Sequence, residues 1–246
     1  MITVGIDLAA EAKGTALAVV EWSQGAANLT SLQLGVADEA LVQAAQAADK
    51  VGIDCALGWP VEFIEFLNRQ SQIGSHADPI DGSIDARRRL AYRETDRRVR
   101  EITGRWPLSV STDRLGLTAI RCAGLLSSMQ SSGIAIDRSG SGKVVEIYPG
   151  ASLRLWGFET KGYRASADIR RELLAHLNGL APWFSFGPHI DLMVESCDAF
   201  DAVIAAVATR AAALNQYEKP SAEQLEQAKI EGWIALPNQP LEALLG

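Results

Sequence analysis

Apolar runs near the beginning of the chain are short, and short polar connections separate them. They predict three antiparallel strands over residues 2–8, 15–22 and 29–34. A stretch of strong helix formers follows at 38–48, with Asp38 as its expected N-cap, and the apolar residues 51–54 return to a strand. Because crossovers of the strand–helix–strand kind are right-handed, this fourth strand is expected to belong to a parallel pair.

The pattern becomes helical after Pro60. Helical spacing recurs in three segments, at 61–70, 85–103 and 114–132. The stretch 71–84 between the first two is rich in Gly, Ser, Asp and Pro, which predicts a loop. One more strand and three more helices are expected, at 143–148, 165–178, 191–214 and 221–231. The predicted fold is a single α/β domain over residues 1–246, with a helical insertion at about 61–142.

Acidic residues occur inside or at the ends of predicted strands. Two strands share the pattern Val-Gly-Ile-Asp and place Asp7 and Asp54 near their carboxyl ends, while Glu146 lies among apolar residues of the strand 143–148. Sites are assembled at the carboxyl ends of parallel strands, so adjacent strands would bring Asp7 and Asp54 close enough to share a cation. Buried carboxylates are normally paired, hydrogen-bonded or metal-bound. Capping of a neighbouring helix or turn is the alternative for each of them.

The Ala-rich helix expected at 191–214 adds further acids. Glu195, Asp198 and Asp201 are spaced by three, so they are expected near one another on one helix face. The residues that follow are almost wholly apolar, so this helix should pack on the sheet and direct its acids to the core or to the edge of a site. The helix dipole accounts for an acid at Asp191, but its effect fades after the first turn and does not account for Asp201.

Several carboxylates gathered in this way suit Mg²⁺ or Mn²⁺, which prefer hard oxygen ligands. Two such ions ~3.5–4 Å apart hold an attacking water and a leaving oxygen during phosphodiester displacement. Zinc is not expected, because the three histidines, His76, His176 and His189, lack ligand spacing to a cysteine or to one another. The sequence also lacks the Gly-x-Ser-x-Gly, GxxxxGK[ST] and GxGxxG motifs.

The order of predicted elements resembles the ribonuclease H-like fold, a mixed sheet with an antiparallel meander, parallel strands and helices on both faces. Asp198-x-x-Asp201 together with Asp7 resembles the acidic site of RuvC-type resolvases. The motifs are similar to those of the domain-of-unknown-function 429 family, whose members are predicted RNase H-like nucleases; they are Gly5–Ala9, Ile53–Pro60, Arg93–Arg97, Glu146–Gly150, Asp198–Ala202 and Glu231–Pro237. The resemblance covers nearly the whole chain. RuvC-type enzymes usually carry Glu on the second acidic strand, where this chain has Asp54, a shorter ligand.

A basic segment, 87–105, contains eight arginines and three acids, whereas the whole chain has a net charge of −7. A helix over this segment would place four of the arginines in one stripe, namely Arg89, Arg93, Arg97 and Arg100. Arginine forks suit phosphates, so Arg93 and Arg97, with Lys13 after the first strand, are expected substrate contacts. The alternative is a solvated helix face with internal ion pairs. This uneven charge predicts one localised basic surface and a modest salt dependence of binding.

These features predict a metal-dependent nuclease that hydrolyses phosphodiester bonds of DNA or RNA. Its expected catalytic residues and metal ligands are Asp7, Asp54, Asp198 and Asp201, and Glu146 is expected as a ligand or water-orienting residue. Two alternatives stay open: a phosphotransferase or ATP-binding protein of the actin and hexokinase type, and a non-catalytic binding or scaffold protein with a degenerate site. No signal peptide, membrane span or disulfide framework is expected, so the predicted location is cytoplasmic, without a membrane partner. The oligomeric state, including a homodimer, stays open.

Overall fold

A mixed six-stranded sheet forms the centre of the computed structural model, which describes residues 1–72 and 83–245. Its strand order is β5-β4-β1-β2-β3-β6. The strands are β1 (Ile2–Asp7), β2 (Ala16–Ser23), β3 (Ala26–Leu34), β4 (Lys50–Asp54), β5 (Val144–Glu146) and β6 (Phe184–Ser185). The first three form an antiparallel meander, and the pairs β1–β4, β4–β5 and β3–β6 are parallel. This is an RNase H-like sheet, as predicted, extended by the two-residue strand β6, which has too little apolar pattern to be foreseen.

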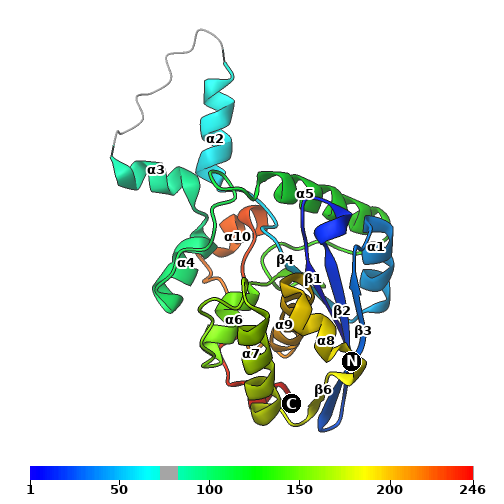
Figure 1. Ribbon diagram of the computed structural model, residues 1–246. Helices are drawn as coiled ribbons and strands as arrows, with labels where there is room; N and C mark the ends of the chain where they lie inside the picture. The colour runs from blue at the N-terminus through cyan, green and yellow to red at the C-terminus, as the bar shows by residue number, and fades with distance from the viewer. Residues whose placement is uncertain (73–82, 246) are drawn as a thin grey trace.

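Helices cover both faces of this sheet (Figure 1). One face carries α9 (Cys197–Ala213), which packs on β1, β2 and β4. The helices α6 (Pro149–Leu155), α7 (Ala167–Leu180) and α8 (Ile190–Glu195) belong to the same core. The other face carries α1 (Asp38–Ala47) and α5 (Gly116–Ser131). The strands supply both cores because their side chains alternate between the two faces. Val4 and Ile6 of β1 belong to the α1 and α5 side, whereas Thr3 and Gly5 face α9.

Two glycines allow α9 to lie directly on the sheet. A Cβ atom at Gly5 would come 2.1 Å from the carbonyl oxygen of Ala202, and one at Gly52 would come 2.0 Å from Thr209 Oγ1. Thr3, two residues before Gly5, donates a hydrogen bond of 2.9 Å to the carbonyl of Ala206. Small residues on both elements therefore set the distance between helix and sheet, which explains why the Val-Gly-Ile-Asp pattern occurs twice and why α9 is rich in alanine.

The connection from β4 to β5 contains α2 (Val61–Gln70), α3 (Ile84–Ala91), α4 (Glu94–Thr103) and α5. In Figure 1, α2 and α3 project from the body, while α4 lies beside α10 (Leu225–Glu231). The single helix expected over 85–103 is wrong: the chain leaves the helical conformation at Tyr92 and Arg93 and starts α4 afresh. Most of the loop expected at 71–84 lies outside the described residues, and its end, Ser83, caps α3.

Two other expectations need correction, and one helix was missed. The long helix expected at 191–214 is two helices, because Ser196 is extended and its side chain accepts a hydrogen bond from the backbone of Ala199. Asp38 is the first residue of α1 and not its N-cap, and its carboxylate accepts hydrogen bonds from Arg121 instead. The short helix α6 was not foreseen. Within the described ranges, no helix has the length and apolarity that crossing a bilayer requires.

Candidate active site

Two aspartates end adjacent parallel strands on the same level of the sheet. Asp7 of β1 and Asp54 of β4 are register partners, and parallel strands lie about 4.8 Å apart. Both side chains face α9, since each lies two residues beyond a glycine, Gly5 or Gly52, that contacts that helix. The sheet therefore holds two carboxylates side by side beneath the first turns of α9.

The beginning of α9 contributes a second pair of acids. Ser196 caps the helix, and Asp198 and Asp201 follow one turn apart, the first exposed and the second 2% exposed. Both line a cleft of about 350 Å³ that Asp7 and Asp54 also line. The predicted gathering of acids from two strands and one helix is thus present in one cleft. Glu195 belongs to α8 and not to this helix, because the chain breaks at Ser196.

Burial and mutual repulsion disfavour ionisation of these acids. Desolvation raises the pKa of Asp54 to about 8, with Asp201 as the next cause, and raises the pKa of Asp201 to about 6. The pKa of Asp7 lies well above its ordinary value, first through desolvation and then through repulsion by Asp54. Such shifts are typical of functional sites, because a fold gains nothing from placing like charges together in a dry environment.

Asp201 already has protein partners on both carboxylate oxygens. The phenol of Tyr163 donates to Oδ1 at 2.8 Å, and Cys197 Sγ donates to Oδ2 at 3.6 Å. The guanidinium of Arg164 forms an ion pair with Oδ2 at 3.5 Å. Neither Tyr163 nor Arg164 was predicted from the sequence, since they lie in a connection without periodicity and no local signal points to the site.

Glu146 lies in the cleft wall, but Arg93 holds it in a buried ion pair. Nη2 and Nη1 of Arg93 donate to the two oxygens of Glu146, each at 2.7 Å, and the backbone N–H of Leu57 donates to Oε2 at 3.1 Å. Arg93 also donates twice to Asp96 and once to the carbonyl of Glu231. Desolvation raises the pKa of Glu146, against the opposing effect of Arg93. Its structure-supported role is to join β5 to α4.

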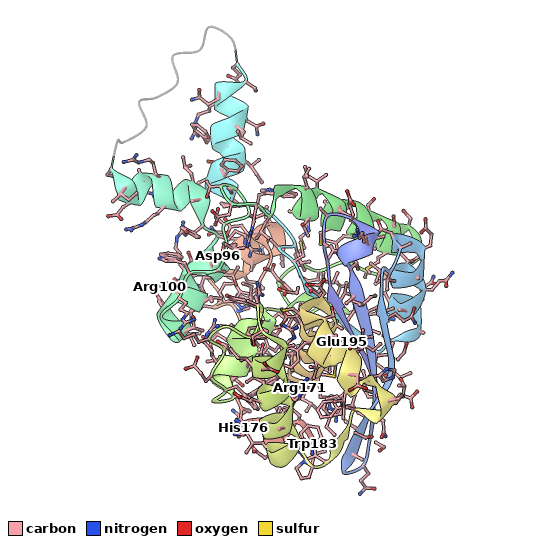
Figure 2. All side chains as sticks on the ribbon, in the orientation of Figure 1. Asp96, Arg100, Arg171, His176, Trp183 and Glu195 are labelled. Carbon is pink, nitrogen blue, oxygen red and sulfur yellow. The ribbon has the colours of Figure 1, made fainter. Side chains whose placement is uncertain are left out.

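The arginine stripe expected to contact phosphate does not form. All five N–H groups of Arg93 are used by protein acceptors, and the residue is 2% exposed, so it has no donor left for a substrate. Asp96 lies on the inner side of α4 and Arg100 on its outer side (Figure 2). Arg97 pairs with Glu94 at 2.9 Å. Lys13 lies exposed in the 3-10 turn after β1.

The family of the chain is shown by a comparison with family models. The model described as "Protein of unknown function (DUF429)" matches residues 5–225. The chain belongs to the DUF429 family. Comparison with curated proteins and with solved structures gave no match. The DUF429 segments singled out in the sequence fall on the elements just described: Asp7 and Asp54 end strands, and Asp198 and Asp201 begin α9.

The DUF429 cleft has the donor chemistry for a hard cation, but its acids are not assembled as ligands. Besides Glu146, which Arg93 neutralises, four described carboxylates line it, and three of these four have raised pKa values that a cation would counteract. Within residues 1–72 and 83–245, however, no three His, Cys, Asp or Glu side chains form a group that could hold a metal ion. The engagement of Asp201 by Tyr163, Cys197 and Arg164 accounts for one missing ligand.

Proposed function

We propose that this protein hydrolyses phosphodiester bonds of nucleic acid in the cleft above β1 and β4. The observation that carries the proposal is the in-register pair Asp7 and Asp54 beneath Asp198 and Asp201 of α9. Partly buried like charges at the carboxyl ends of parallel strands cost stability, and a cation would offset that cost. The meeting of these acids at one edge of an RNase H-like sheet supports the proposal.

The carboxylates that would hold Mg²⁺ or Mn²⁺ are Asp7, Asp54 and Asp198, and Asp201 would join them only by exchanging its present partners Tyr163, Cys197 and Arg164. A bound divalent ion would supply a Lewis acid that lowers the pKa of water and stabilises charge on the phosphate. In the hydrolysis, the water oxygen bonds to phosphorus, the phosphorus–oxygen bond to the leaving group breaks, and the leaving oxygen takes a proton. A carboxylate of the cleft would orient the water and accept its proton.

The rest of the cleft supports a nucleotide as ligand. Leu108, Leu115 and Tyr148 also line it and offer an apolar surface on which a base can pack. The volume of about 350 Å³ lies at the small end of ligand sites. Space of this size suits one unstacked nucleotide better than an intact duplex, which favours a single-stranded or unpaired substrate.

A cleavage assay tests the proposal. The purified full chain is incubated with Mg²⁺ or Mn²⁺ and with single-stranded, duplex and branched DNA and RNA. Cleavage of at least one substrate is expected, and Asp7→Asn should abolish it. Asp191→Asn is the matched control, because Asp191 is an exposed acid on α8 outside the cleft. Absence of cleavage on every substrate, or equal cleavage by Asp7→Asn, contradicts the proposal.

A non-catalytic binding protein is the second candidate. The observation that favours it is the lack of an assembled metal group among the described residues. This candidate predicts that the chain binds nucleic acid with the same affinity with and without Mn²⁺ and that Asp7→Asn binds as the wild type does. The nuclease proposal instead predicts tighter substrate binding when Mn²⁺ is present.

A further inference from the structure

The side of the cleft next to α9 already contains a cation. Arg164 Nη2 lies 3.5 Å from Asp201 Oδ2, and Arg164 Nε donates to the phenol oxygen of Tyr163, which in turn donates to Asp201 Oδ1 at 2.8 Å. The two partners differ in exposure, since the Asp201 side chain is 3% exposed and the Arg164 side chain is 55% exposed. One end of the guanidinium therefore meets the buried acid and the other end meets solvent in the cleft.

Buried contacts fix the backbone that carries this arginine. Arg170 of α7 is 5% exposed, and its guanidinium donates only to backbone carbonyls. It reaches Tyr163 at 2.7 Å on the connection before α7 and Val194 at 2.8 Å on α8. The segment with Tyr163 and Arg164 is thereby tied to the helix that leads into Asp198 and Asp201, so the position of Arg164 beside Asp201 is built into the fold.

The other side of the cleft has no such cation. Within the described parts of the chain, neither Asp7 nor Asp54 forms an ion pair. The remaining guanidinium in the cleft wall, Arg93, is fully committed to Asp96, Glu146 and a carbonyl. Among the described residues, an ion pair therefore supplies positive charge at Asp201, whereas Asp7 and Asp54 are reached by Arg164 through a longer-range attraction that opposes their raised pKa values.

We propose that Arg164 takes the place of one of the two divalent ions that an acidic nuclease site commonly uses, so that this site binds a single ion. The ion would be held at the side of Asp7 and Asp54, with Asp198, while Asp201 holds Arg164. Nη1 of Arg164 has no hydrogen-bond partner among the described residues and is available to a phosphate oxygen of the substrate. This inference rests on the proposed function and specifies that one divalent ion and Arg164 together balance the negative charge of the cleft.

Calorimetric titration of the full, metal-free chain with Mn²⁺ alone tests the inference. The wild type should bind one ion per chain. Arg164→Gln should bind Mn²⁺ about fivefold more tightly or take a second ion, because a like charge has left the cleft. Arg164→Lys, which keeps the charge, should retain one ion with an affinity close to wild type, as should Arg171→Gln, a control at an exposed arginine of α7 (Figure 2).

The outcomes separate this inference from the proposed function. Binding of two Mn²⁺ ions by the wild type would overturn the role of Arg164, as would equal Mn²⁺ affinity in the wild type and Arg164→Gln. Either result would do so even if the wild type cleaves nucleic acid and Asp7→Asn does not. Failure of every variant to bind Mn²⁺, together with absence of cleavage, would overturn the proposed function and this inference with it. Circular dichroism of each variant confirms that the fold is kept.

Discussion

Asp7 lies opposite Asp54 in the parallel ladder between β1 and β4, and both side chains face the helix α9. This relationship places two carboxylates in a partly buried position with a third, Asp201, across the cleft. The arrangement destabilises the ionised, cation-free state, because each charge is desolvated and repelled by the others. Folding gains no stability from this arrangement, which supports the proposed function.

Stability without metal should fall as pH rises through the range in which Asp54 loses its proton. Its pKa is about 8 in the folded protein and near 3.8 when unfolded, so the folded state binds more protons between these values. Thermal unfolding in EDTA should show Asp54→Asn more stable than wild type at pH 8.5 and little different at pH 4. A gain of several degrees is expected, since each kcal/mol shifts Tm by about 2–4 °C in a chain of this size. Equal melting temperatures at pH 8.5 would show that Asp54 ionises without cost.

Gly5→Ala should destabilise the protein strongly, because its new methyl group would meet the backbone of α9 at Ala202 and Ala206. Overpacking of this kind costs about 1–3 kcal/mol, and backbone neighbours leave little room for adjustment. Gly124→Ala on the exposed side of α5 is the control, with nothing within 4 Å of the new Cβ. The control should gain up to about 1 kcal/mol of helix stability. Chemical denaturation measures both, and a neutral Gly5→Ala would refute the close approach of α9 to the sheet.

Arg93→Gln should cost about 3–5 kcal/mol, because it leaves Glu146 and Asp96 as buried acids without a counter-charge. Arg100→Gln, on the exposed outer side of α4, should change stability by no more than about 0.5 kcal/mol. Urea denaturation of the two variants measures the contrast. If Arg93 were a phosphate contact, its loss would instead weaken substrate binding and leave the unfolding free energy nearly unchanged.

Lys13→Gln should weaken binding of single-stranded nucleic acid without affecting the fold. Lys13 is exposed in the turn that follows β1, close in sequence to Asp7. Loss of one phosphate contact should reduce the slope of log K against log salt by about 0.7 for single strands. Fluorescence anisotropy between 50 and 200 mM salt measures this slope. An unchanged slope would remove Lys13 from the binding surface.

The sequence was sufficient for the elements with a strong local pattern. The repeated Val-Gly-Ile-Asp segments predicted two buried strands with acids at their ends, and the register now pairs Asp7 with Asp54. The apolar stretch after Asp201 predicted a helix packed on the sheet. In both cases the information is local, because the period of apolar residues decides which face is buried.

Two of the failures came from contacts between distant segments. No glycine or proline marks the break at Arg93. The chain turns there because the Asp96 carboxylate accepts hydrogen bonds from the backbone and the side chain of Arg93. The Arg93 guanidinium also donates to Glu146 and to the carbonyl of Glu231, which are distant in the sequence. The position of Arg164 in the cleft likewise depends on a long-range contact, its ion pair with Asp201. The break at Ser196 had a local signal, since serine is a favoured N-cap.

A crystal of the full chain soaked in Mn²⁺ and measured at the manganese absorption edge tests the central claim most directly. The account predicts an anomalous peak bound by both Asp7 and Asp54 at about 2.0–2.3 Å, with Arg164 still beside Asp201. A cleft without any peak at saturating Mn²⁺, or a peak that contacts neither Asp7 nor Asp54, would contradict it.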